Sequence, residues 1–210
     1  MRSTQRFSLL TSCSHVWLSE DSWCFGASCC RLYASQIGRR KHMSKEALEF
    51  ITKRRSIRRF TGEPISRESL KTILKAAMAA PSANNSRPWQ FLVVTDKEKI
   101  AAICNAHPYA KFGVDAGAVI IPFGKKEGYK WFDQDMGAAT ENLLLAAANL
   151  GLGATWCGVL GDLEPRVHSA ADLPDDMFAF ALIPIGVPAE VQPPRTQYDE
   201  KRVRWETCSD

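Results

Sequence analysis

Residues 81–89 have the composition of a rigid polar binding loop. They read Pro-Ser-Ala-Asn-Asn-Ser-Arg-Pro-Trp, and the two prolines fix φ at two points and remove two main-chain donors. The side chains between them offer amides, hydroxyls and a guanidinium, and an amide both donates and accepts, as the edge of a heterocycle requires. The segment therefore predicts a cradle for a flat, hydrogen-bonding ligand; the alternative is a plain connector between a helix and a strand.

A second segment, 54–60, carries groups suited to binding a phosphate. It reads Arg-Arg-Ser-Ile-Arg-Arg-Phe, with four arginines around Ser56. Guanidinium groups bind a phosphate dianion bidentately, and a hydroxyl fills a remaining site. The alternative is a solvated basic helix end, where cations also favour the helix dipole. No Gly-rich phosphate loop occurs, so side chains would hold the phosphate, with Arg195 as a further cation late in the chain.

These segments need helices and strands to position them. Apolar residues at helical spacing predict helices over 44–53, 66–78, the residues after Asp96 to 104, and 132–150, with a further turn or two in 163–170. Ser66 and Asp96 are placed as N-caps, and Gly151 as a C-terminal stop. Short apolar runs over 91–95, 118–123, 154–159 and 178–187 predict strands covered on both faces. The pattern predicts an α+β protein, a three-layer α-β-α sandwich.

Composition narrows the function classes. The chain has 210 residues, enough for one domain with a sizeable core. All of its formal net charge of +4 lies in residues 1–42, while residues 43–210 are balanced, which argues against nucleic-acid binding by bulk charge. No apolar run approaches the ~20 residues of a membrane span. The seven cysteines are dispersed without metal-ligand spacing, which predicts no metal site and a reducing, cytoplasmic location.

Residues 1–42 differ from the rest of the chain. Their mixed Ser, Cys, Arg and Trp composition supports no core, and Met43 is followed by a good helix start. We expect a non-structural extension: a transit peptide, which would make the location organellar, a disordered tail, or translated upstream sequence. Residues 43–210 are then the functional domain.

Several ordered motifs together resemble the FMN-dependent nitroreductase family. Arg-Arg-Ser-x-Arg-x-Phe at 54–60 is followed by Pro-Ser-Ala-x-Asn-x-x-Pro-Trp-x-Phe at 81–91. The helix region 135–142, the stretch Gly-Leu-Gly-Ala-Thr-Trp at 151–156 and the closing residues 195–205 are also similar. The resemblance covers about residues 45–206, nearly all of the chain beyond the extension.

The resemblance implies a homodimer with a large shared interface, two FMN sites built across it, and a C-terminal arm on the partner subunit. It assigns the FMN phosphate and ribityl end to Arg54, Arg55, Ser56 and Arg58, with help from Arg195. It assigns the isoalloxazine ring to Pro81, Ser82, Ala83 and Asn85, with Ser86 beside them. The turn containing Cys157 and Gly158 falls where the family places a main-chain N–H near flavin N5, and the side chain of Cys157 is either part of the site or a buried small hydrophobe.

The implied activity is an FMN-dependent NAD(P)H oxidoreductase. Hydride would pass from NADH or NADPH to flavin N5 and then to a small oxidised acceptor, such as a nitroaromatic or a quinone, in a ping-pong sequence. The flavin carries the chemistry, so His107 and His168 are interpreted as structural or surface groups. Two alternatives stay open: another acceptor (an enone, a halogenated aromatic or oxygen), or a flavin-binding protein without turnover. Residues 125–131 are either a lid over the pocket or an ordinary loop.

Overall fold

The computed structural model describes residues 49–208. The predicted extension 1–42 and the first part of the helix expected over 44–53 lie outside this range; helix α2 is described over Glu49–Lys53. Within the described residues, no helix combines the length and apolar character needed to cross a membrane.

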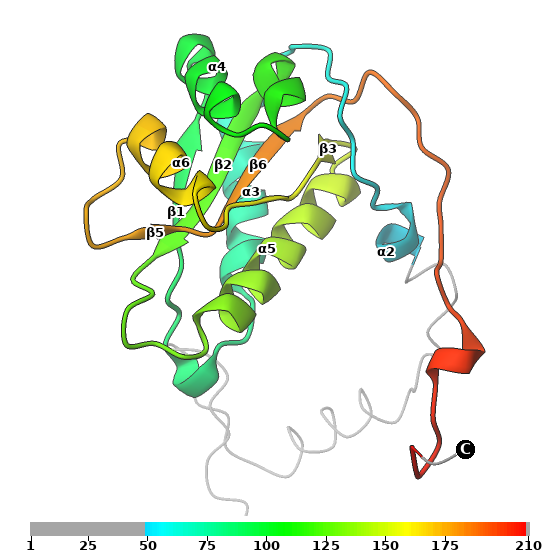
Figure 1. Ribbon diagram of the computed structural model, residues 1–210. Helices are drawn as coiled ribbons and strands as arrows, with labels where there is room; N and C mark the ends of the chain where they lie inside the picture. Colours follow the sequence, from blue (N-terminus) through cyan, green and yellow to red (C-terminus); the bar gives the residue numbers. More distant parts are fainter. Residues whose placement is uncertain (1–48, 209–210) are drawn as a thin grey trace, which may run out of the picture. The chain divides into compact units, whose positions relative to one another are not determined.

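The described domain is built on an antiparallel sheet (Figure 1). Its path runs β1 (Gln90–Val94), β2 (Ala118–Gly124), β6 (Ala181–Gly186), β3 (Gly153–Ala154), while β4 (Cys157–Gly158) also pairs with β6 and β5 (Phe178–Ala179) pairs with β2. The apolar runs predicted as strands all contribute to it. The predicted α+β class is confirmed by this sheet and the helices around it.

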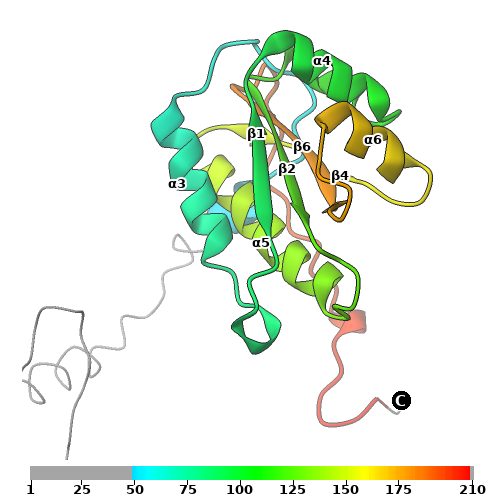
Figure 2. The same ribbon diagram turned by 90° about the vertical axis from the view of Figure 1, so that its left-hand side faces the viewer.

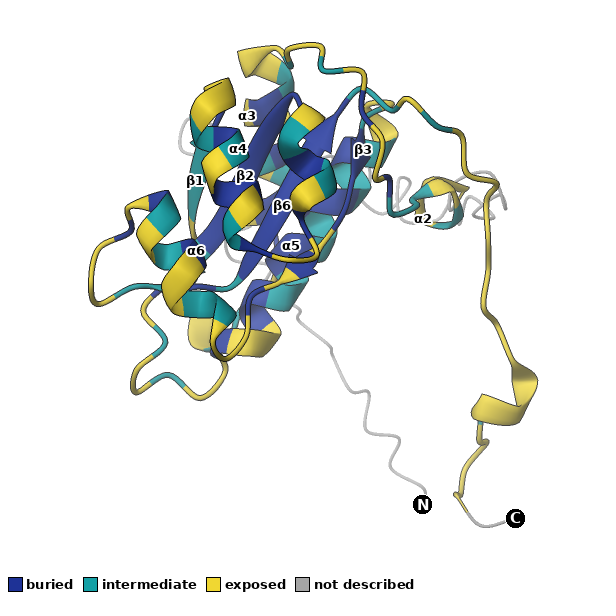
Figure 3. Ribbon diagram, turned by 45° about the horizontal axis from the view of Figure 1, so that its top comes forward, coloured by how far each residue is buried: buried dark blue, intermediate teal, exposed yellow. Residues whose placement is uncertain are grey.

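Alternation along β2 gives the sheet two apolar faces. Val119 and Ile121 belong to one buried cluster with residues of α4 (Lys97–Ala106) and α6 (Leu163–Ala171). Ala118 and Ile120 belong to another with residues of α3 (Arg67–Met78) and α5 (Phe132–Asn149). Since successive side chains of a strand point to opposite faces, helices cover both sides, as Figures 2 and 3 show.

Local signals place the helix ends. The side chain of Ser66 accepts a hydrogen bond from Ser69 N, and that of Asp96 accepts one from Lys99 N, so both predicted N-caps are confirmed. Helix α5 ends at Asn149, and Gly151 follows with φ +76°, the left-handed conformation that glycine adopts without steric cost. The predicted stop there is confirmed.

Two of the predicted strands are interrupted, and each interruption has a cause. The expected strand 154–159 divides into β3 and β4 because its ladder with β6 places Thr155 opposite Pro184, which has no N–H to donate. The expected strand 178–187 divides into β5 and β6 at a bulge. Ala179 faces Phe123 whereas Ile183 faces Ile120, so the β5–β6 segment contains one residue more than β2 over the same length of the ladder.

Candidate functional site

The arginine segment, residues 54–58, lies along the outer edge of β3. Ser56 forms a parallel bridge with Ala154, and the Ile57 N–H donates to the Ala154 carbonyl at 3.1 Å. The hydroxyl of Thr155 donates to the Ile57 carbonyl at 2.6 Å. The side chain of Ile57 is buried, whereas the flanking residues Ser56 and Arg58 are half-buried and exposed. The buried Ile57 thus fixes a short strand whose neighbours face solvent.

The arginine segment lies beside the C-terminal residues 190–195. Arg55 donates to the Pro193 carbonyl, and the main-chain N–H of Arg58 donates to Glu190 Oε1 at 2.7 Å. The Arg195 N–H donates to the Thr52 carbonyl at 3.1 Å. The structure therefore brings Arg195 beside the predicted phosphate-binding residues, although 137 positions separate Arg58 from Arg195.

One arginine of the segment is paired with a carboxylate on α5. Arg54 Nε lies 3.5 Å from Glu141 Oε1, with 30% and 47% of the two side chains exposed. An ion pair this exposed contributes about 0–1 kcal/mol. A phosphate dianion can therefore compete for Arg54 at little cost. Sequence reasoning missed Glu141, because the pairing depends on how α5 packs against the segment.

The Ser-Asn loop, residues 81–87, has an unusual main chain. Asn84, Asn85 and Arg87 have φ values of +53°, +53° and +47°. Asn adopts this left-handed conformation at a modest cost in conformational free energy, whereas Arg adopts it at a higher cost. A hydrogen bond from Arg87 N to Ser82 Oγ at 3.0 Å closes the loop on itself. Strain held by local bonds on an exposed loop is common at ligand-binding sites.

A buried carboxylate anchors the Ser-Asn loop to the start of α5. The Ala83 N–H lies 3.1 and 3.2 Å from the two oxygens of Asp135, a residue only 6% exposed. The hydroxyl of Tyr129 donates to the same carboxylate at 2.5 Å and also contacts Ser86 Oγ and the Ala83 carbonyl. Burial, and secondly the bond to Asp135, raise the pKa of Tyr129, so its hydroxyl remains a donor.

This arrangement also places residues 125–131, which the sequence left open between a lid and a loop. Tyr129 ties the segment to the Ser-Asn loop, and Lys126 Nζ pairs with Asp133 at 3.0 Å. Trp131 remains 41% exposed. The segment therefore lies against the loop with an aromatic side chain free to contact a ligand. The sequence contains these residues but gives no sign of their contacts.

The β4 edge directs some of its main-chain groups away from β6. Thr155 N and Val159 N donate to the carbonyls of Pro184 and Phe180 on β6. Because the groups of alternate residues in an antiparallel ladder point in opposite directions, Trp156 and Gly158 direct theirs away from β6. A Cβ built on Gly158 would meet nothing within 4 Å. The edge therefore has an accessible N–H and room for a flat ligand close to the main chain.

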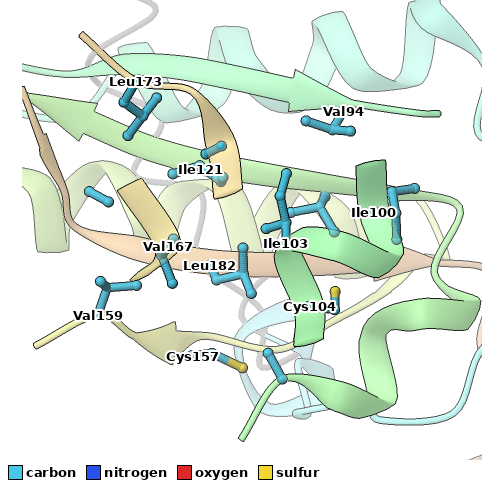
Figure 4. Close-up of a cluster of buried hydrophobic side chains, with 14 residues drawn as sticks. Val94, Ile100, Ile103, Cys104, Ile121, Cys157, Val159, Val167, Leu173 and Leu182 are labelled. Carbon is cyan, nitrogen blue, oxygen red and sulfur yellow. The ribbon is translucent and has the colours of Figure 1, made fainter. Parts of the chain in front are cut away.

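The side chain of Cys157 points elsewhere. It is 6% exposed and belongs to the cluster shown in Figure 4, together with Cys104. Burial raises the pKa of Cys157 to about 11, against an opposing effect of the Arg58 charge, and raises that of Cys104 to about 12. The structure thus supports the buried small hydrophobe, and any contribution of Cys157 to a site would come from its main chain.

In one chain the arginine segment and the Ser-Asn loop are separate. No hydrogen bond or ion pair joins them among residues 49–208. Each contacts α5, the loop at Asp135 and the segment at Glu141, residues that are roughly 9 Å apart along the helix axis at 1.5 Å per residue. Pro81 and Asn85 are exposed. The loop and the segment therefore contact different parts of α5.

Comparison with known proteins identifies the family of this chain. A model of the nitroreductase family matches residues 51–109 and 105–187. The chain belongs to the nitroreductase family. The match includes the arginine segment, the Ser-Asn loop and the β4 edge, which confirms the resemblance seen in the motifs.

Individual members of the nitroreductase family align over most of the domain. A protein of Methanothermobacter thermautotrophicus, provisionally named an NADH dehydrogenase/NAD(P)H nitroreductase, is 40% identical over 169 residues, 77% of this chain and 87% of its own. The crystal structure of a Bacteroides thetaiotaomicron protein with the same provisional name superposes with a TM-score of 0.74 and 34% identity, covering 78% of this chain and 98% of that one.

One solved member of the family contains a flavin. The structure of a provisionally named nitroreductase from Desulfovibrio desulfuricans was determined in complex with FMN. It is 31% identical, has a TM-score of 0.67, and covers 78% of this chain and 98% of its own. Within residues 49–208 of the present chain, no group of three or more His, Cys, Asp or Glu side chains could hold a metal ion.

Proposed function

We propose that this nitroreductase-family oxidoreductase binds FMN and transfers electrons from NADH or NADPH to a small oxidised acceptor. The observation that carries the proposal is the shared edge of β3 and β4. Ser56 pairs with Ala154 at one position of this edge, and Gly158 presents its N–H four residues further on. At about 3.3 Å per residue these positions are roughly 13 Å apart, which suits a ligand with a phosphate at one end and a ring at the other.

The residues at the two ends of this edge fit the two ends of FMN. Arg54, Arg55 and Arg58 with the Ser56 hydroxyl supply the cations and donor that a phosphate dianion requires. At the other end, the Gly158 N–H points away from β6, and a Cβ built on Gly158 would meet nothing within 4 Å. A main-chain N–H at that point would orient the ring and withdraw electron density from it, which makes the ring a better hydride acceptor.

When bound, FMN would supply the redox chemistry for a ping-pong exchange of electrons between the nicotinamide and a second, oxidised substrate in the same pocket. The protein binds, orients and tunes. The arginine segment holds the phosphate, and Pro81 and Pro88 stiffen the Ser-Asn loop against the ring. Asp135 fixes that loop from behind through the Ala83 N–H. No acid–base residue is required at the site, and we propose none.

We further propose that a homodimer completes each site. The Ser-Asn loop and the arginine segment of one chain contact different parts of α5 and make no hydrogen bond to each other within the described range. We interpret them as half-sites that would be joined across two subunits. The C-terminal residues 191–208 are exposed except for the half-buried Val203, and they include Val191, Tyr198 and Trp205, at 97%, 71% and 75% exposure. Such apolar side chains would be covered if this arm lay along a second copy.

The acceptor that fits this geometry is small and flat, such as a nitroaromatic or a quinone. Residues 125–131 form a short segment held against the Ser-Asn loop by Tyr129. Its exposed Trp131 offers an aromatic face for stacking. An enone, a halogenated aromatic or oxygen would fit the same pocket, and a substrate panel distinguishes these acceptors.

Anaerobic mixing with reduced nicotinamides tests the proposed function. The purified full chain is loaded with FMN, separated from free flavin and mixed with NADH or NADPH without oxygen. We expect the flavin absorbance to bleach with at least one of the two and to return when a quinone is added. Bound flavin that never bleaches would favour a binding protein without turnover, and a protein that does not retain FMN would refute the proposal.

A further inference from the structure

His107 is a buried histidine with both ring nitrogens engaged by main-chain groups. It follows α4 and is 1% exposed. Its Nδ1 accepts a hydrogen bond from the Tyr109 N–H at 3.2 Å, and its Nε2 lies 2.9 Å from the Gly158 carbonyl oxygen. Because Nδ1 is an acceptor, the proton of the neutral ring is on Nε2. His107 therefore donates to Gly158.

The acceptor of that bond belongs to the β4 edge. Thr155 and Val159 direct their N–H groups to β6, so the N–H and C=O of Gly158 both point outward. The outward carbonyl is held by His107, while the neighbouring N–H is the group that faces the proposed flavin. Gly158 has no side chain to hold it in place, and a Cβ there would contact nothing.

The turn after α4 contacts β4 at a second point. Cys157 Sγ lies 3.7 Å from the Tyr109 carbonyl oxygen, close to the His107 bond to the next residue. The His107 and Tyr109 rings also meet edge-on, with centroids 6.0 Å apart. The turn 107–109 is thus a support behind β4, on the α4 side of the sheet, and it stabilises one orientation of the Gly158 main chain.

We infer that His107 is a positioning residue for the flavin: its Nε2–H holds the Gly158 carbonyl so that the Gly158 N–H stays aimed at the bound ring. The inference rests on the proposed function and extends it to a residue that does not touch the ligand. Nothing in the sequence marks His107 for this role, because its partner is 51 residues away. Removal of the His107 Nε2–H donor should change the protein's affinity for the flavin and the reduction potential of the bound flavin, in addition to any change in the stability of the fold.

A pair of variants of similar volume separates these effects. His107→Gln keeps an amide donor, whereas His107→Met fills similar space without one. Each variant and the wild type, as full chains, are titrated with FMN, and the midpoint potential of the bound flavin is measured. We expect the Gln variant to stay near the wild type, and the Met variant to bind FMN roughly threefold to tenfold more weakly with a more negative potential.

A matched control and the possible outcomes complete the test. His168, in α6, makes the same kind of bond, from Nε2 to the Pro174 carbonyl at 3.0 Å. His168→Met should leave FMN affinity and potential unchanged. If both His107 variants match the wild type, or if Met lowers the melting temperature while affinity and potential stay fixed, the inference is wrong and the proposed function stands. A wild type that binds no FMN would overturn both.

Discussion

The Ala83 N–H donates to the carboxylate of Asp135, at 3.1 Å from Oδ1, across a separation of 52 residues. Asp135 lies in the first turn of α5, where the helix dipole favours a negative charge. The same carboxylate accepts from Tyr129. One buried group thus fixes the Ser-Asn loop, residues 125–131 and the start of α5 together.

Removal of this carboxylate should loosen the Ser-Asn loop. Asp135→Ala leaves the Ala83 N–H and the Tyr129 hydroxyl without their acceptor, and we expect a loss of about 1–3 kcal/mol in the free energy of unfolding and weaker FMN binding. Urea unfolding and FMN titration measure the two effects. The control is Asp133→Ala, which removes an exposed pair with Lys126 and should cost less than about 1 kcal/mol. Equal effects of the two variants would contradict the anchoring role.

The open space at Gly158 allows a test of whether the flavin ring lies close to the β4 main chain. A Cβ there meets nothing within 4 Å in the chain alone, so Gly158→Ala should fold normally. If a flavin ring lies against this main chain, the added methyl should weaken FMN binding by tenfold or so, a free-energy cost of about 1.4 kcal/mol. Circular dichroism and FMN fluorescence titration measure folding and affinity.

Gly153 provides the opposite case on the same edge. A Cβ there would lie 2.6 Å from two carbons of Ile57, so Gly153→Ala should lower stability by about 1–3 kcal/mol through overpacking. For the Gly158 prediction above, the contradicting result is a Gly158→Ala variant that binds FMN with wild-type affinity, because that would show that no ring approaches β4.

The buried cysteines should be unreactive. Burial raises the pKa of Cys157 to about 11 and that of Cys104 to about 12, so at pH 8 the thiolate is roughly one part in a thousand or less, and reactivity should rise with pH. Cys208 is exposed. Alkylation at pH 8 followed by peptide mass spectrometry should label Cys208 in the native chain, and Cys104 and Cys157 only after unfolding. Rapid native labelling of Cys157 would show that its side chain is accessible.

Sequence reasoning succeeded where the deciding interactions are local. The N-caps Ser66 and Asp96 each bond an N–H three residues ahead, and the glycine after α5 needs only its own positive φ. Strand positions followed from apolar runs, but their interruptions did not. The break at Thr155 depends on Pro184 across the ladder, and the bulge depends on the register with β2.

Part of the candidate site could likewise be predicted from the sequence, and part depends on packing. The arginine segment and the Ser-Asn loop are visible as residue types, and the structure shows where each lies. Asp135, Glu141 and His107 were not singled out as site residues, because their partners are distant in the sequence and chosen by packing. For Cys157 the sequence left two interpretations open, a side chain in the site or a buried small hydrophobe. Its 6% exposure agrees with the second.

Discrimination between FMN and riboflavin tests the central claim most directly, because the two flavins differ only in the phosphate. The full chain and the double variant Arg54→Ala with Ser56→Ala are titrated with both; Arg166→Ala, on α6, controls for lost charge. Charge-assisted hydrogen bonds contribute about 1.5–3 kcal/mol each. The wild type and the control should therefore prefer FMN by at least roughly tenfold, and the double variant, which keeps Arg55 and Arg58, should lose most of that preference while remaining folded. A double variant that keeps the wild-type preference for FMN would contradict the account.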